Sequence, residues 1–133
     1  MRARSACRHV HGASTVQLWV GPKENSIRME GVIREADAGT WLDPLMDEIH
    51  RTALRAALDE VILDIRRLEY ANAVVWRCLV QWIRRMRELR DAYRIVILSD
   101  PNRHWQAVGA PALRTFSLDA TGTERLILKA GYS

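Results

Sequence analysis

A few side chains in this chain carry the groups from which catalytic sites are built. Asp64 stands near the end of an apolar run, where a carboxylate can serve as a general acid or base. His50 and His104 offer imidazoles but lie far apart in the sequence, and His104 is the better functional candidate because it follows a strand-end loop. No Ser–His–Asp spacing, glycine-rich phosphate loop or paired metal-ligand spacing is present. We therefore predict that the protein is not an enzyme and that Asp64, which has no partner base, is structural.

Three potential metal ligands, Cys7, His9 and His11, alternate near the start of the chain. Structural zinc normally takes four protein ligands, and no second cluster completes the set, so neither a metal nor another cofactor is expected. Residues 1–14 are polar and basic without periodicity, which predicts a flexible arm before a single domain over residues 15–133.

The elements that must position these side chains centre on residues 60–90. Residues 61–65 are apolar and mostly β-branched, as in a strand buried on both faces. Residues 66–71 are expected to leave the strand as a turn, and Asn72 is a suitable N-cap for a helix from Ala73 to about Ala92. Helical spacing gives this helix one apolar face, made of Val75, Cys78, Leu79, Trp82, Ile83, Met86 and Leu89.

The first part of the chain is expected to form a hairpin and a helix. Alternating apolar residues predict strands at 15–20 and 26–33, joined by turn residues. A helix over about 41–58 begins either at Asp43–Pro44 or one turn earlier at Trp41–Leu42. Its expected buried stripe is Leu42, Leu45, Met46, Ile49, Ala53 and Ala56.

After the central unit we expect a strand at 94–98, two short helices within 104–116, and a last segment at 124–129 that is a strand or a short helix. This order predicts the α/β class: a mixed sheet opened by an antiparallel hairpin, followed by strand–helix–strand units with helices packed against the sheet. Functional loops gather at the carboxyl ends of parallel strands, so segments 66–73 and 99–104 should be neighbours.

Two apolar residues of the long predicted helix, Trp76 and Val80, lie outside its apolar face and towards Arg87. An apolar pair on the solvent side near a helix N-terminus indicates an interaction surface with Trp76 as its anchor. The alternative is that a neighbouring loop covers Trp76.

The segments Leu63–Ile65 and Leu68–Val75, followed by an amphipathic helix, resemble the centre of a STAS domain. STAS domains are the anti-sigma-factor-antagonist modules of bacterial partner-switching systems. Their centre has an aromatic residue, an aliphatic residue, Asp and Ser before the helix. In this chain Tyr70 occupies the aromatic place, Ala71 the aliphatic place and Asn72 that of the Asp.

The chain departs from the STAS pattern where switchable members are phosphorylated. Ala73 replaces the serine, while Val74 and Val75 replace a hydroxyl residue and a glycine. The resemblance therefore implies a STAS-like fold and an interaction module without the phosphate switch. The implied partner is an anti-sigma factor or a serine-kinase-like regulator, and homodimer formation stays open. The expected partner-binding residues are Tyr70, Asn72, Ala73, Val74, Trp76, Val80 and Arg87.

Two alternatives remain. One is a small-molecule or nucleotide sensor, with a ligand loop in which Arg66, Arg67, Arg103 and His104 hold an anion. The other is the STAS subunit of a transporter complex.

Composition limits the choice of partner and compartment. The formal charge is +4, and the arginines of the long helix do not form a continuous basic face, so no nucleic-acid partner is expected. No segment resembles a signal peptide or is apolar enough to enter a bilayer, which predicts a cytoplasmic protein. The resemblance to STAS domains implies a bacterial one.

Overall fold

Alternating apolar residues build an antiparallel meander at the start of the fold. The computed structural model describes residues 5–20, 25–89, 93–113 and 126–130. Strands β1 (Ser5–His11), β2 (Ser14–Val20) and β3 (Asn25–Ile33) pair antiparallel in succession. The predicted hairpin of the second and third strands is thereby confirmed.

Three strand–helix–strand crossovers complete the sheet. Strands β4 (Glu60–Ala71), β5 (Arg94–Ser99) and β6 (Leu126–Ala130) follow in parallel, so that the sheet order is β1-β2-β3-β4-β5-β6. The crossover helices are α1 (Gly39–Arg55), α2 (Ala73–Arg87) and α3 (His104–Ala112). The predicted α/β class, with a mixed sheet opened by an antiparallel hairpin, is confirmed, as is a strand rather than a helix at the last segment.

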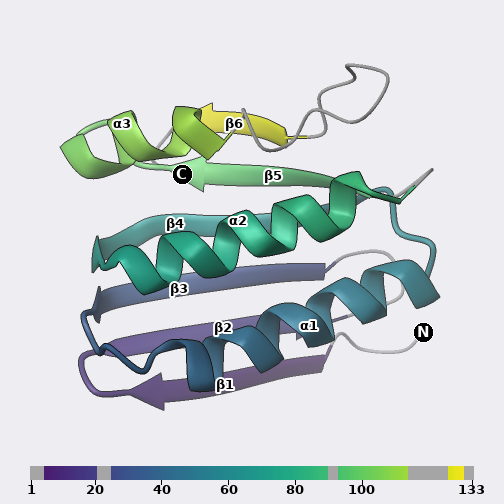
Figure 1. Ribbon diagram of the computed structural model, residues 1–133, viewed down its shortest axis with the longest axis horizontal. Coiled ribbons are helices and arrows are strands. Elements are labelled where there is room, and N and C mark those ends of the chain that lie inside the picture. The colour runs from purple at the N-terminus through teal and green to yellow at the C-terminus, as the bar shows by residue number, and fades with distance from the viewer. Residues whose placement is uncertain (1–4, 21–24, 90–92, 114–125, 131–133) are drawn as a thin grey trace.

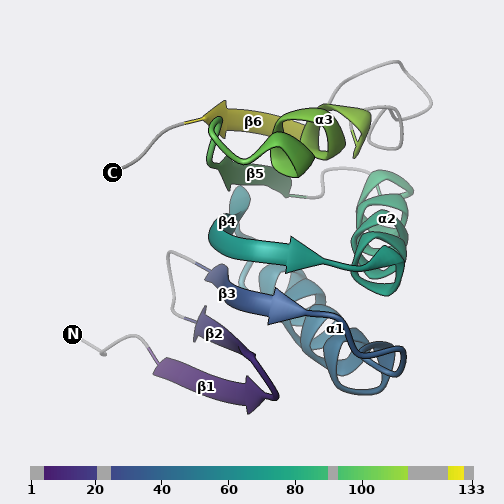
Figure 2. The same cartoon turned by 90° about the vertical axis from the view of Figure 1, so that its left-hand side faces the viewer.

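All three helices lie on one face of the sheet (Figures 1 and 2). Successive right-handed crossovers that advance in one direction across a sheet place their helices on the same side. The core lies between this helix layer and the strand residues that face it, such as Leu18, Ile27 and Leu63. In the described part of the chain no helix covers the opposite face, which we call the open face.

The apolar stripes of α1 and α2 are buried largely as predicted, with one exception on each helix. Ala56 lies just beyond the end of α1 and is exposed, and Leu89 lies beyond α2 and is 37% exposed. Both helices end before these positions, so the residues leave the helical face on which they were counted. The part of the predicted long helix at residues 90–92 lies outside the described residues.

The place of His50 near the edge of the predicted apolar stripe of α1 indicates a partly exposed surface histidine, yet the structure buries it, with 4% exposed. Its Nδ1 lies 2.6 Å from the Tyr93 hydroxyl, which also accepts a hydrogen bond from Trp82 Nε1 at 2.7 Å. Because an indole N–H can only donate, the tyrosine hydrogen is available for His50 Nδ1, which then accepts. Burial, helped by the positive charge of Arg85, lowers the pKa of His50 despite the opposing charge of Asp47.

Several predicted boundaries are wrong. Residues 5–11 of the expected arm form β1, because the Gly12–Ala13 turn, with Gly12 at φ 56°, folds them onto β2. Residues 1–4 lie outside the described part. Helix α1 begins before Asp43–Pro44, in agreement with the earlier alternative start. One helix, α3, continues through Gly109 and Pro111, where a break between two helices was expected. Residues 114–116 of that predicted range lie outside the described part.

Candidate functional site

The carboxyl ends of β3 and β4 meet the first turn of α2. Asn72 stands between them, and its Oδ1 accepts hydrogen bonds from the backbone N–H groups of Val74 (3.1 Å) and Val75 (3.3 Å). Its Nδ2 donates to the Glu35 carbonyl at 3.0 Å, and its backbone N–H donates to Ile33 O at 3.0 Å. The predicted N-cap is confirmed, and the same side chain also ties α2 to the connection between β3 and α1.

An aromatic ring and a small side chain are exposed beside this cap. Tyr70 is 49% exposed, and Ala73, the first residue of α2, is also exposed. Val74 is half-buried and packs against the core. We call the four residues Tyr70, Asn72, Ala73 and Val74 the docking edge. The docking edge is held rigidly because Asn72 forms hydrogen bonds both to the first turn of α2 and to the connection between β3 and α1.

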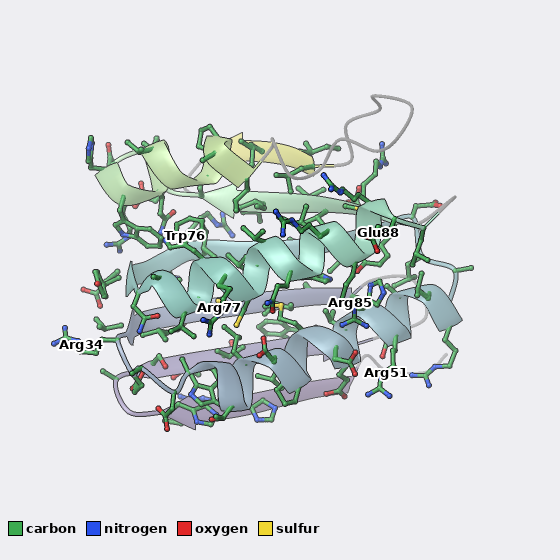
Figure 3. All side chains as sticks on the ribbon, viewed as in Figure 1. Arg34, Arg51, Trp76, Arg77, Arg85 and Glu88 are labelled. Carbon is green, nitrogen blue, oxygen red and sulfur yellow. The ribbon has the colours of Figure 1, made fainter. Side chains whose placement is uncertain are left out.

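The structure separates Trp76 from the docking edge. Its ring meets the Trp105 ring edge-on, with centroids 5.8 Å apart and an interplanar angle of 77°. Gly109 of α3 approaches so closely that a Cβ there would lie 2.7 Å from Trp76 Cη2. Figure 3 shows Trp76 on the side of α2 that faces α3. The expectation that Trp76 is an exposed anchor is therefore wrong: the side chain is half-buried, and the neighbour that partly covers it is a helix.

The other two residues of the expected surface also lie away from the docking edge. Val80 is half-buried against the core. Arg87 is the last residue of α2, about 20 Å along the axis from the first at a rise of about 1.5 Å per residue. A partner at the docking edge does not need either of them.

Segments 66–73 and 99–104 are neighbours, as predicted, but the first of them is mostly strand. Strand β4 pairs with β5 only as far as Asp64 and then continues to Ala71 along β3. This leaves backbone carbonyls of β4 without a strand partner on the β5 side. A buried carbonyl in that position must find another donor.

Side chains of α3 supply those donors. Gln106, which is fully buried, donates through Nε2 to the carbonyls of Ile65 (2.6 Å) and Leu68 (2.9 Å), while its Oε1 accepts from Asp100 N at 2.8 Å. Trp105 Nε1 donates to the Glu69 carbonyl at 2.9 Å. Sequence reasoning missed Gln106, whose only signal is an amide between apolar neighbours on a short helix.

The four residues of the predicted ligand loop do not converge on one pocket. Arg66 binds the Asp64 carboxylate, whereas Arg67 is 75% exposed and lies 3.9 Å from Glu30. Arg103 donates through Nε to the Arg66 carbonyl at 3.2 Å. His104 is exposed at the start of α3. The expected anion pocket between the two segments is therefore wrong in its geometry.

Asp64 has the structural role that was predicted, with arginine as its main partner. Arg66 donates to Oδ1 from its backbone N (3.1 Å) and Nε (3.0 Å), and to Oδ2 from Nη2 (2.9 Å). Arg28 Nε lies 3.5 Å from Oδ2. Burial acts to raise the pKa of Asp64, but the hydrogen bonds and charge of Arg66, with the charge of Arg28, outweigh it and lower the pKa. The carboxylate is therefore ionised at neutral pH, and its lowered pKa makes it a weaker proton acceptor than an ordinary Asp side chain.

Within the described residues, no three His, Cys, Asp or Glu side chains are grouped as a metal site would require. His9 and His11 face each other along β1 with ring centroids 6.4 Å apart, and His11 stacks on Trp41 at 4.0 Å. The described helices are all too short or too polar to span a membrane.

Comparison with protein-family models finds none that matches the chain, and comparison with curated proteins finds none either.

Proposed function

We propose that the chain is a non-catalytic protein-interaction module that binds a regulatory protein through the docking edge. The observation that carries this proposal is the exposure of Tyr70 beside a capped helix start. Tyrosine is enriched among residues that dominate protein–protein binding, because its ring buries a large area with little loss of side-chain freedom.

Rigidity of the edge supports the same function. The hydrogen bonds of Asn72 fix the backbone on both sides of the exposed groups before any partner arrives. A preorganised surface loses less conformational entropy on binding than a flexible loop does, so a small contact can reach useful affinity.

The resemblance of Leu63–Ile65 and Leu68–Val75 to STAS domains suggests the kind of partner. It would be an anti-sigma factor or a serine-kinase-like regulator of the bacterial cytoplasm. Because Ala73 has no hydroxyl group, binding would not be switched by phosphorylation at that position. The module would be permanently competent to bind, and control would come from the amount of the chain or of its partner.

Site-specific cross-linking tests the proposal. The photoreactive residue p-benzoylphenylalanine replaces Tyr70 in the full chain, which is then irradiated in cells of its natural host. The matched control carries the same residue at Leu54, which is 41% exposed near the end of α1. We expect one regulatory protein to be cross-linked from position 70 and not from position 54. Identical products from both positions would contradict the proposal.

The substitution Ala73→Ser tests the lost switch separately. It restores a hydroxyl at the first position of α2, where a phosphate is favoured by the free N–H groups of the helix start. We expect a kinase-like partner to phosphorylate the variant and to release it afterwards. If the purified cross-linked partner has kinase activity but leaves the introduced serine unmodified, that kinase does not recognise this edge.

A further inference from the structure

The open face carries a second group of side chains that the docking edge does not use. A hollow of about 240 Å³ lies over β2 to β5. Its lining combines an aromatic ring, apolar side chains and charged groups: Trp19, Ser26, Arg28, Ile62, Asp64, Arg66 and Leu98, next to Ile27, whose side chain lies in the core on the other face. Strand register brings these residues together, because Ser26 pairs with Ile62 and Arg28 pairs with Asp64 across β3 and β4, while Asp64 pairs with Leu98 across β4 and β5.

The charged side chains that line the hollow, Arg28, Asp64 and Arg66, carry a net positive charge. Arg66 binds Asp64 through two points of its guanidinium, at 3.0 and 2.9 Å, so that this pair is close to neutral. Arg28 is the additional cation, with 38% of its side chain exposed. An anion approaching the hollow therefore meets an attractive field despite the carboxylate at its centre.

The Trp19 ring also holds the Arg28 side chain in place. Its guanidinium carbon lies 5.1 Å from the centroid of the Trp19 ring, within the range of a cation–π interaction. Together with the 3.5 Å contact to Asp64, this ring limits the orientations of the guanidinium. An arginine fixed in this way can bind a carboxylate through two parallel N–H donors with little further ordering.

The remaining lining favours an apolar body on the ligand. Ile62 and Leu98 are half-buried on the open face next to the charged group. Drug-sized ligands occupy sites of about 300–1,000 Å³, so this smaller hollow suits a molecule of about ten non-hydrogen atoms. From charge and shape together we infer that the hollow binds a small organic carboxylate, with its anionic group on Arg28 and its apolar body against Ile62 and Leu98.

Titration of the full chain with phenylacetate, followed by amide NMR spectra, tests this inference. Phenylacetamide has the same body without the charge, and acetate has the charge without the body. We expect saturable binding of phenylacetate with shifts centred on β3 and β4, and at least about tenfold weaker binding of both analogues. The absence of saturation up to about 10 mM phenylacetate, or equal binding of phenylacetamide, would overturn the inference.

Two variants locate the binding group. Arg28→Gln removes the additional cation, and Ser26→Glu adds a carboxylate to the lining on a strand surface that tolerates polar residues. Both should weaken phenylacetate binding at least about tenfold, whereas Arg94→Gln, which removes an exposed arginine of β5 outside the hollow, should not. Unchanged binding in both lining variants, each checked for a native spectrum, would refute the site. Ligand-free shifts at the hollow that depend on protein concentration would also overturn the inference, since a second copy would then occupy this face.

Discussion

Replacing Gln106 with leucine tests how α3 is fixed to the sheet. The substitution keeps the volume of the side chain but removes its three hydrogen bonds, two buried ones to carbonyls of β4 and one part-buried one from Asp100 N. Each buried polar group left without a partner costs about 1–3 kcal/mol. Asp100 is only half-buried, so water can reach its N–H, whereas the carbonyls of Ile65 and Leu68 lie behind α3.

The expected loss is smaller than three full penalties. Leucine gains some apolar burial, and the Asp100 N–H is partly solvated. We therefore expect the free energy of unfolding to fall by about 3 kcal/mol. Small domains are stable by about 5–15 kcal/mol, so the variant should still fold. With an m-value of about 1.5 kcal/mol/M, the urea midpoint would move down by about 2 M.

Urea denaturation followed by tryptophan fluorescence and circular dichroism measures this change. The matched control is Gln81→Leu, because Gln81 is exposed on α2, and its effect should stay within about 0.5 kcal/mol. A loss below about 1 kcal/mol for Gln106→Leu would refute the reasoning, because the β4 carbonyls would then not depend on α3.

Three further perturbations follow from the same contacts. Trp76→Ala removes the edge-on contact with Trp105 and the packing on Gly109, and thermal or urea denaturation should show a loss of about 2–3 kcal/mol, less than for a fully buried tryptophan. Asn72→Ala removes the cap of α2 and the bond to the Glu35 carbonyl, with an expected loss of about 1–2 kcal/mol in the same assay. At pH values above the unfolded-state pKa of about 6.5, His50 is neutral in both the folded and the unfolded chain. Because burial lowers the pKa of His50 in the folded chain, only the unfolded chain gains a proton as the pH drops below about 6.5. The free energy of unfolding should therefore fall as the pH is lowered from about 6.5 through the folded pKa, and His50→Gln should lack this part of the pH dependence.

Local sequence patterns predicted those parts of the fold that depend on residues close together in the chain. The alternation of Val16, Leu18, Ile27 and Met29 predicts the hairpin, and all four are buried on one face. Asn72 caps α2 as expected because the capping interaction involves only the next three residues.

Features that depend on pairing between distant segments were not predicted. Strand β1 has no apolar alternation, because an edge strand needs only backbone partners and can carry polar side chains on both faces. The extension of β4 to Ala71 depends on β3 pairing on one side and on Gln106 on the other, which no local signal reveals.

The candidate site was predicted where its residues are close together in sequence and missed where they come from distant segments. Tyr70, Asn72, Ala73 and Val74 are nearly contiguous in sequence, so a motif could identify them, and the structure keeps them together. Trp76 was assigned to the surface from its helical angle alone, and its partial burial depends on a distant helix that begins only at His104. Arg28 was missed because its importance comes from lying beside Asp64 of another strand.

The most direct test of the proposed function is the affinity of Tyr70→Ala for the regulator recovered by cross-linking, measured by isothermal titration calorimetry beside the wild type and Leu54→Ala. A dominant interface tyrosine contributes about 2 kcal/mol or more, so Tyr70→Ala should bind about thirtyfold more weakly, with the stability of its fold unchanged. Equal affinities of Tyr70→Ala and Leu54→Ala for that protein would contradict the assignment of the docking edge.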